Sequence, residues 1–245
     1  EMGVVGTIFQ DRIPSVAAFQ LPFLFTDYDQ ARAALYEGDY GYQLIGDVAS
    51  LGFTVNGIVP DGFRVMTMNK KVESLADMHG LKMRMPNLEI MVEIGNYLGF
   101  AVTPMSMTEV FSALEQGVID GQENPPSTIR SQGWYEIQDY LLVSNHVFTS
   151  LFLCVNNDFY NSLDSELQNI LDEVIDETCA QIWDTAQTQA QEDLDYMSSE
   201  GGIEVYEPSD SFRQEMVEAT APMYDNMYET APEVEEVINA IQAIQ

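Results

Sequence analysis

Residues 102–125, "VTPMSMTEVFSALEQGVIDGQENP", contain the clearest helix signal in the chain, and the rest of the fold can be built outward from it. Ser106 and Glu109 fit the S-x-x-E capping box, which satisfies backbone N–H groups in the first turn of a helix. Gly117 ends the helix, because glycine readily adopts the conformation that stops one. The predicted apolar face of this helix comprises Val110, Phe111 and Leu114.

The polar turn that follows, "VIDGQENPPSTIR" at residues 118–130, groups Asp120, Glu123 and Asn124 around Gly121. Asp120 and Glu123 could serve as a general acid and a general base. However, no nucleophile or metal-ligand set accompanies them, and the chain has no HExxH, GxSxG, P-loop or GxGxxG motif. A role in a turn or a cap is therefore favoured for both acids.

The segments on either side of this stretch alternate between helix and strand patterns. Residues 53–60 and 63–69 have the alternating apolar positions of strands, and 146–155 predicts a long buried strand. Apolar residues at three- and four-residue steps predict the longest helix, roughly 164–199. This alternation indicates an α/β protein with a mostly parallel sheet.

Composition excludes several classes of partner. The 245 residues include 40 acidic and 9 basic side chains, for a net charge of −31, which would repel nucleic acid and anionic lipid. A solvated surface suited to salty surroundings is the favoured explanation of this acidity, and an interface for a basic partner is the alternative. The longest apolar stretch is too short to span a bilayer.

The two cysteines, Cys154 and Cys179, show neither a CxxC motif nor a metal-ligand spacing. Buried free thiols are expected, with a single disulfide as the alternative, and no metal or cofactor is predicted. The first ten residues lack the pattern of a signal peptide and resemble a strand already under way. The chain is therefore expected to begin within a fold.

Basic residues cluster in one part of the chain. Five of the nine lie between residues 64 and 84, where even spacing would place about one. The lysines there, Lys70, Lys71 and Lys82, fit an exposed turn and a strand end. Arg64 and Arg84 differ because each interrupts an apolar strand-like run, where an arginine needs a partner. An internal ion pair would explain one of them as well as ligand binding does, and together they favour an anion site.

Several segments in fixed order resemble the substrate-binding proteins of tripartite ATP-independent periplasmic (TRAP) transporters, the DctP-like family. The order "TEVFSALEQG" then "DGQENP" is the most specific part, and the likeness extends more loosely to the end of the chain. The matching segments are "AFQLPFLF" (18–25), "GFRVMTMNKKVESLADMHGLKMRMPN" (62–87), "VTPMSMTEVFSALEQGVIDGQENP" (102–125) and "WYEIQDYLLVSNH" (134–146).

The resemblance implies a two-lobed, periplasmic-binding-protein-like α/β fold with mixed sheets, hinge strands and a long helix. Lobe I would comprise 1–61 and 150–200, and lobe II would comprise 62–149. Residues 201–245 would form a strand and helices that pack across the lobes. Family members carry about one more N-terminal β-α-β unit than this sequence, so that unit is expected to be missing.

The resemblance also implies site residues. The arginine of the "GLKxRxP" motif, Arg84 here, would pair with a ligand carboxylate, and Asn124 of "GQENP" would contact the same group. The complete expected ligand-binding set is Arg84, Asn124, Arg64, Asn87, Met107 and Phe111. Glu123 and His146 would form a polar network with Arg64 that is linked to closure. The family commonly has an aromatic residue where this chain has Met107, which implies a broader pocket here.

The function implied by the resemblance is the capture of a small organic acid outside the cytoplasm. The protein would be periplasmic, or tethered to the membrane as a lipoprotein, and would deliver its ligand to the membrane subunits of an ion-gradient-driven TRAP permease. A ligand sensor for a signalling receptor is one alternative. An enzyme acting on a carboxylic acid is another, disfavoured by the missing catalytic motifs. The sequence does not identify the acid.

Overall fold

The structure is a computed structural model that describes residues 1–6, 9–10, 12–46 and 48–244. The chain divides into two compact units. Unit 1 comprises Glu1–Gly62, Phe148–Gln187 and Asn226–Gln245, and unit 2 comprises Phe63–Val147 and Thr188–Asp225. Residues 188–225 group with unit 2 because Leu194, Met197 and Ile203 pack into its hydrophobic core. The family resemblance predicts instead that 188–200 belong to lobe I and that 201–245 form a separate segment.

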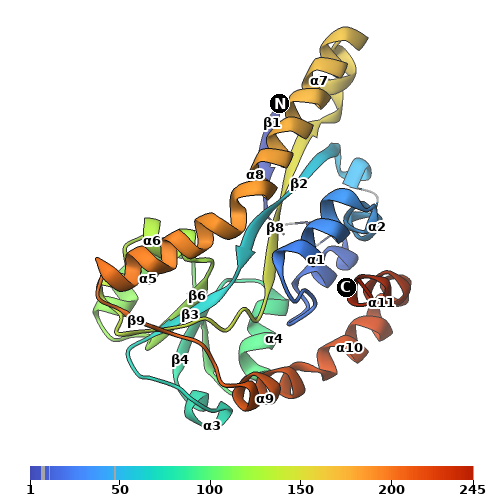
Figure 1. The fold of residues 1–245 in the computed structure, drawn as a ribbon. Helices are drawn as coiled ribbons and strands as arrows, with labels where there is room; N and C mark the ends of the chain where they lie inside the picture. Colours follow the sequence, from blue (N-terminus) through green and yellow to red (C-terminus); the bar gives the residue numbers. More distant parts are fainter. Residues whose placement is uncertain (7–8, 11, 47, 245) are drawn as a thin grey trace. The chain divides into compact units, whose positions relative to one another are not determined.

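Unit 1 contains a small sheet with the strand order β1-β8-β2 (Figure 1). Strand β1 pairs antiparallel with β8, from Met2 opposite Val155 to Val5 opposite Phe152. The strands are β1 (Met2–Val5), β2 (Phe53–Phe63) and β8 (Phe148–Asn156). The helical elements are η2 (Pro14–Gln20), α1 (Tyr28–Arg32), η3 (Ala33–Glu37), α2 (Tyr40–Ile45), η4 (Val48–Leu51), α7 (Asn157–Ser162), η6 (Pro232–Val234) and α11 (Glu235–Gln242).

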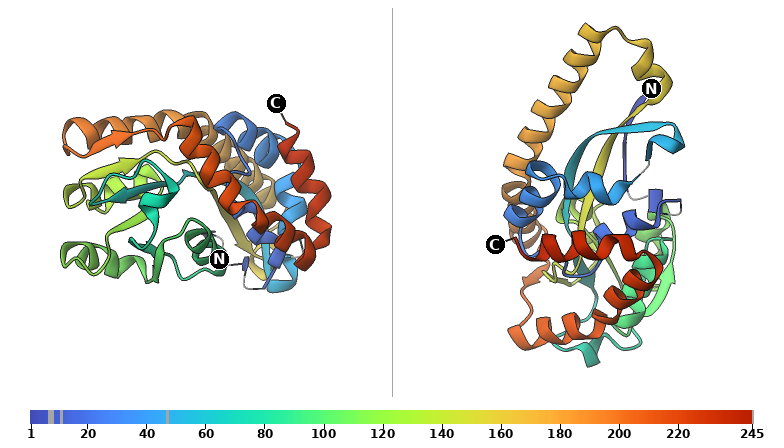
Figure 2. Two further views of the ribbon diagram at one scale, coloured as in Figure 1. Left: turned by 90° about the horizontal axis from the view of Figure 1, so that it is seen from below. Right: turned by 90° about the vertical axis from the view of Figure 1, so that its right-hand side faces the viewer.

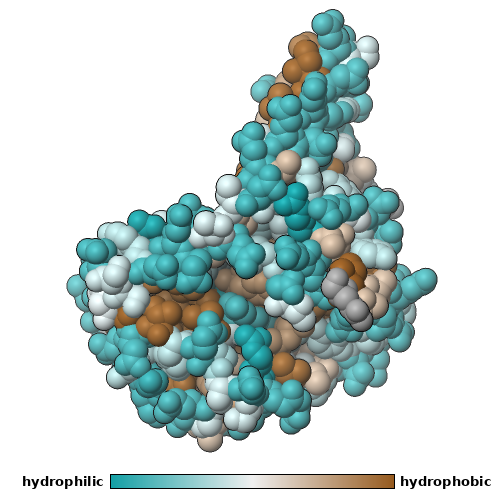
Figure 3. All heavy atoms as spheres, in the orientation of Figure 1, coloured by the Kyte–Doolittle hydropathy of each residue, from teal (hydrophilic) through white to brown (hydrophobic). Residues whose placement is uncertain are grey.

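The long helix α8 (Ser165–Ser199) and the helix α10 (Pro222–Thr230) each contribute residues to both units. The long helix is confirmed almost to the residue. In unit 1 it packs on the sheet through Ile175 and Cys179. Leu167, Ile170 and Val174, near the N-terminal end of α8, are about half exposed. Figure 3 shows brown apolar surface at this end of the helix.

Both cysteines of unit 1 are free and buried, as the sequence favoured. Burial raises the pKa of the Cys154 thiol to about 11 and, with a smaller contribution from Asp176, raises that of Cys179 to about 11. The thiols are therefore protonated and unreactive at neutral pH.

Unit 2 is built on a six-stranded sheet with the order β5-β4-β6-β3-β7-β9. The strands are β3 (Val65–Met68), β4 (Lys82–Met85), β5 (Ala101–Pro104), β6 (Gly121–Asn124), β7 (Tyr140–Leu142) and β9 (Glu204–Tyr206). The sheet is mixed, because β3 runs antiparallel to both of its neighbours while the other described pairs are parallel. The other five strands all run in the same direction, so this sheet is mostly parallel, as expected, apart from the reversed strand β3, which helix–strand alternation does not reveal.

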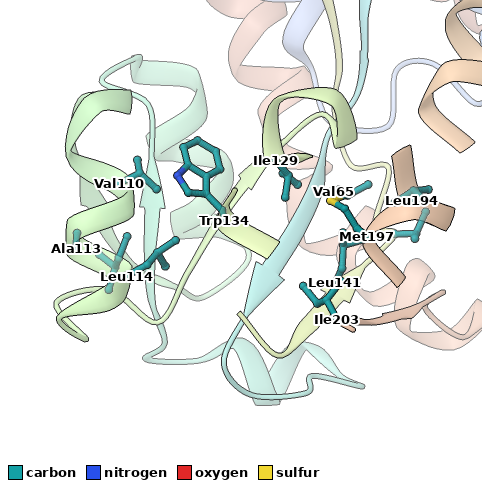
Figure 4. Packing of buried hydrophobic residues seen from close by; sticks show 12 residues of the cluster. Val65, Val110, Ala113, Leu114, Ile129, Trp134, Leu141, Leu194, Met197 and Ile203 are labelled. Carbon is teal, nitrogen blue, oxygen red and sulfur yellow. The ribbon is translucent and has the colours of Figure 1, made fainter. Parts of the chain in front are cut away.

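One face of this sheet is covered by α5 (Met107–Glu115), α6 (Pro126–Ser131) and the last turns of α8. Figure 4 shows their side chains gathered with those of the sheet into one hydrophobic cluster. Trp134, in the short helix η5 (Trp134–Glu136), is 1% exposed and belongs to this cluster.

The helix α4 (Glu89–Tyr97) packs on β4 and β5, and α9 (Asp210–Thr220) runs beside α3 (Leu75–Met78) and α4 (Figure 2). Gly95 permits the close approach of α4, because a Cβ there would come within 2.9 Å of the Met85 side chain. Together these helices leave the middle of β6 completely buried.

The capping box of α5 is confirmed. The Glu109 carboxylate accepts a hydrogen bond of 3.1 Å from the backbone N–H of Ser106 and one of 2.6 Å from its hydroxyl. Val110 and Leu114 face the core, but Phe111 is 38% exposed. The prediction that Phe111 belongs to the apolar face packed on the core was wrong. The buried face of α5 consists of Val110, Ala113 and Leu114, and Phe111 lies beside it.

Within the described part of the chain, none of the helices combines the length and the apolar character needed to cross a membrane. The described residues likewise contain no group of three or more histidine, cysteine or acidic side chains placed to hold a metal ion.

Candidate binding site

The strand β6, with the sequence "GQEN", lies in the interior of the unit 2 sheet between β4 and β3. A strand this polar is buried only if every side chain has a partner. Gly121 at its start is needed because a Cβ there would collide with the backbone carbonyl of Thr67. Side chains alternate along a strand, so Glu123 projects from one face of β6 while Gln122 and Asn124 project from the other.

The ion-pair face, as we call the side that carries Arg64, Glu123 and His146, is closed on itself. Nε and Nη2 of Arg64 donate to the two carboxylate oxygens of Glu123, and Nη2 also donates to the backbone oxygen of Glu123 at 2.8 Å. Glu123 is 0% exposed and Arg64 6%. Such a two-pronged pair compensates the loss of water around both charges.

His146 completes this face and is also fully buried. Its Nδ1 shares a hydrogen bond of 2.8 Å with the Ser144 hydroxyl, and its Nε2 lies 3.4 Å from Oε2 of Glu123. Burial raises the pKa of the Glu123 carboxyl, but Arg64 and then His146 outweigh burial, so that the pKa is lowered overall. The Glu123 side chain is therefore a carboxylate at neutral pH and is unsuited to proton transfer.

The amide face, as we call the side that carries Thr67, Gln122, Asn124 and Arg84, contains a line of neutral hydrogen bonds. Nδ2 of Asn124 donates to Oε1 of Gln122 at 2.8 Å, and Nε2 of Gln122 donates to Oγ1 of Thr67 at 2.9 Å. Gln122 lies opposite Thr67 on β3 and opposite Arg84 on β4. The four residues therefore occupy one face of three adjacent strands.

Arg84 is 3% exposed and differs from Arg64 in its partners. Its Nε and Nη2 both donate to one neutral group, the backbone carbonyl of Met105, at 3.1 and 2.9 Å. Its Nη1 is buried and has no hydrogen-bond partner among the described residues. The pKa of the guanidinium is lowered to about 10, chiefly by burial; Glu123 opposes this shift and nearby Arg64 adds to it. Arg84 is thus a buried cation without a dedicated internal counter-ion in the described structure.

The geometry of the guanidinium defines where an anion can bind. A guanidinium has two edges that each present a pair of N–H donors. One edge is formed by Nε and Nη2, and the other by Nη1 and Nη2. The Met105 carbonyl occupies the first edge. The second edge, which contains the unpartnered Nη1, has the shape that accepts both oxygens of a carboxylate.

The other predicted site residues lie outside this buried group. Asn87 is exposed, just after β4, and Met107 and Phe111 are 43% and 38% exposed on the same side of α5, one turn apart. Asp120 has a structural role, because its carboxylate accepts a 2.9 Å hydrogen bond from the backbone N–H of Lys82. This agrees with the turn or cap role favoured for Asp120.

Four contributors to this group were not predicted from the sequence: Thr67, Gln122, Ser144 and the backbone carbonyl of Met105. A signal was available for Gln122, because it lies inside the quoted motif and two residues before Asn124. The Met105 carbonyl gives no sequence signal at all, since every residue has one.

Comparison with known proteins identifies the group of proteins to which the chain is related. Residues 1–231 match the family described as "Bacterial extracellular solute-binding protein, family 7", DctP. The chain belongs to this family. Its members are substrate-binding transport proteins found outside the cytoplasm and are not enzymes.

Individual relatives are also named as binding proteins. The C4-dicarboxylate-binding periplasmic protein DctP of Rhodobacter capsulatus is 30% identical over 211 residues, and the alignment covers 86% of this chain but only 63% of the relative. A TRAP periplasmic solute-binding protein from Haemophilus influenzae, solved with L-gulonate, is 31% identical with a TM-score of 0.88, over 98% of this chain and 79% of that one.

A second solved structure is similar over nearly the whole chain. The sugar acid binding protein DctPAm of Advenella mimigardefordensis, in complex with galactonate, is 28% identical with a TM-score of 0.91, over 99% of this chain and 79% of that chain. These likenesses confirm the expected fold class, the two-lobed α/β fold of periplasmic binding proteins.

Proposed function

We propose that this protein binds a small organic acid anion through Arg84 and supplies it to a TRAP permease. The observation that carries the proposal is the buried Arg84 guanidinium, whose Nη1 has no partner among the described residues while its other side is held by Met105. Burying an unpaired charge is costly, so such a group is retained where an anion compensates it.

The described site favours a carboxylate as the anion. A carboxylate that leaves water needs its hydration replaced, and a guanidinium fork does so with two parallel hydrogen bonds. Asn124 adds a neutral amide on the same face. In this proposal Asn87, Met107 and Phe111 would contact the remainder of the ligand, and the exposed thioether of Met107 would accommodate ligands of different shape.

Arg64 acts indirectly in this proposal. Its fork is engaged by Glu123, which matches the internal ion pair that the sequence left open as its explanation. Glu123, His146 and Arg64 would hold β6 in place and would link ligand binding to closure. The charge of Arg64 also disfavours a second cation nearby, which increases the benefit of an anion at Arg84.

Family membership supports the transport role. The relatives named above bind C4-dicarboxylates, gulonate and galactonate, all of them organic acids with a carboxylate. The proposal also includes closure of the protein around the anion and its delivery to an ion-gradient-driven permease. The protein would be either free in the periplasm or tethered to the membrane.

The test is calorimetric titration of the purified protein with L-gulonate, galactonate and succinate, in the wild type and in Arg84→Ala. Removing one partner of a buried charge pair costs about 2–5 kcal/mol. We therefore expect Arg84→Ala to weaken binding by roughly 30-fold to several thousand-fold. A thermal-shift screen identifies the best acid first, because a ligand at 100 times its Kd adds about 2.7 kcal/mol of stability.

Lys82→Ala is the matched control. Lys82 is exposed, lies two residues before Arg84 on β4, and its removal changes the net charge by the same amount. This variant should bind like the wild type. Equal affinity in Arg84→Ala and the wild type, or no stabilisation by any carboxylate, would contradict the proposal.

A further inference from the structure

The line of hydrogen bonds on the amide face restricts how Asn124 can present itself. Its Nδ2 donates to Oε1 of Gln122, and the Gln122 amide is itself held by the hydroxyl of Thr67. Reversing the Asn124 amide alone would bring its Oδ1 against Oε1 of Gln122, which places two acceptors together, so Gln122 would have to reverse with it and the Thr67 hydroxyl would have to donate instead of accept. All three side chains are at most 3% exposed, so water is poorly placed to replace a lost bond.

In this orientation the Asn124 amide has defined groups left for a ligand. A primary amide offers two N–H donors and an oxygen acceptor. One N–H is used by Gln122, so Asn124 retains one donor and Oδ1 for a ligand. A plain carboxylate carries acceptors only and cannot satisfy Oδ1. A hydroxyl next to the carboxylate can donate to Oδ1 while Arg84 holds the charge.

We infer that Thr67 and Gln122 are positioning residues that orient Asn124 to accept a ligand hydroxyl, so that the site prefers 2-hydroxy acids over the corresponding deoxy acids. This inference rests on the proposed function and specifies its substrate class. The preference follows from the cost of leaving a buried acceptor without a donor, which corresponds to roughly 5- to 150-fold in affinity.

The experiment measures affinity for two matched pairs of acids that differ by one hydroxyl at C2: malate against succinate, and D-gluconate against 2-deoxy-D-gluconate. Calorimetry is performed on the full chain of the wild type and each variant. In the wild type, the hydroxy acid of a pair should bind at least about 5-fold more tightly than its deoxy partner.

Three variants test the line of hydrogen bonds. Gln122→Met keeps the side-chain volume but frees the Asn124 amide, and Thr67→Val removes the hydroxyl that holds Gln122. Both should bring the affinity ratio of each pair toward one while changing the affinity for the deoxy acid by less than about 3-fold. Thr67→Ser keeps the hydroxyl and should restore the wild-type ratio.

Thr103→Val is the matched control, because Thr103 lies opposite Arg84 on β5 but its hydroxyl contacts only the Ala101 carbonyl among the described hydrogen bonds. It should keep the wild-type ratio. A wild-type ratio near one, or an unchanged ratio in folded Gln122→Met and Thr67→Val, would overturn the inference. Binding that depends on Arg84 but not on the C2 hydroxyl would leave the proposed function intact, whereas binding independent of Arg84 would overturn both.

Discussion

The two faces of the strand β6 each bury an arginine but treat it differently. On the ion-pair face, Arg64 engages both oxygens of Glu123, and the pair is supported by His146. On the amide face, Arg84 is held by one backbone carbonyl and keeps an unpartnered Nη1 within the described structure. The contrast is between a buried charge that is paired within the protein and one that has no internal counter-ion in the described structure. Burial alone would not distinguish them, because both side chains are nearly inaccessible.

The largest expected effect on stability is on the ion-pair face. Arg64→Met should lower the free energy of unfolding of unit 2 by about 3–5 kcal/mol, because it leaves the Glu123 carboxylate buried without its partner. Each unit contains one tryptophan, Trp134 in unit 2 and Trp183 in unit 1. Urea unfolding followed by fluorescence in a Trp183→Phe background therefore reports on unit 2. A loss below about 1 kcal/mol would show that the pair contributes little to the fold.

The second expected effect is a pH dependence confined to the same face. In the folded protein the pKa of Glu123 lies below its ordinary value of 4.5. At a pH between the folded pKa and 4.5, the unfolded chain therefore binds more protons at Glu123 than the folded chain does. The stabilisation is thus fully present above pH 4.5 and is lost as the pH falls through the folded pKa.

Comparing the wild type with Glu123→Gln removes the background of the other acidic residues. The difference in their free energy of unfolding, measured by urea unfolding from pH 7 down to pH ~3, should be largest at neutral pH and should shrink below the ordinary carboxyl pKa. A difference that stays constant over this range would mean that the Glu123 carboxyl is not the titrating group.

The smallest expected effect is on the amide face. Arg84→Met removes a buried charge that lacks an internal counter-ion in the described structure, so the free energy of unfolding of ligand-free unit 2 should stay within about 1 kcal/mol of the wild type or rise. The same fluorescence assay measures it. A loss as large as that of Arg64→Met would erase the contrast between the two faces and would assign Arg84 a structural role.

Much of the fold could be predicted from local patterns. The capping box at Ser106 and Glu109 and the long helix 165–199 are encoded by residues close in sequence, and both are confirmed. The reversed direction of β3 and the exposure of Phe111 were not predictable in this way. The direction of β3 depends on the strands with which it pairs, and the exposure of Phe111 depends on which side of α5 the sheet covers. A strand or helix period specifies neither.

The site was predicted in part. Charge clustering and apolar surroundings singled out Arg64 and Arg84 from the sequence, and the resemblance singled out Asn124. Their different situations were not predictable, because Glu123 lies 59 residues from Arg64 and Gln122 lies 55 residues from Thr67. Such long-range partners are set by the strand order, which brings β6 between β3 and β4.

The sequence by itself determined that this chain is an acidic α/β protein with two arginines in apolar strands and a polar "GQEN" segment that must be satisfied internally. Only the tertiary structure decided which arginine is paired. The physical reason is the alternation of side chains along β6, which directs the one carboxylate of that strand to Arg64 and leaves its two neutral amides on the face of Arg84. An amide does not neutralise a guanidinium, so the charge of Arg84 has no internal counter-ion among the described residues, as the proposed anion site requires.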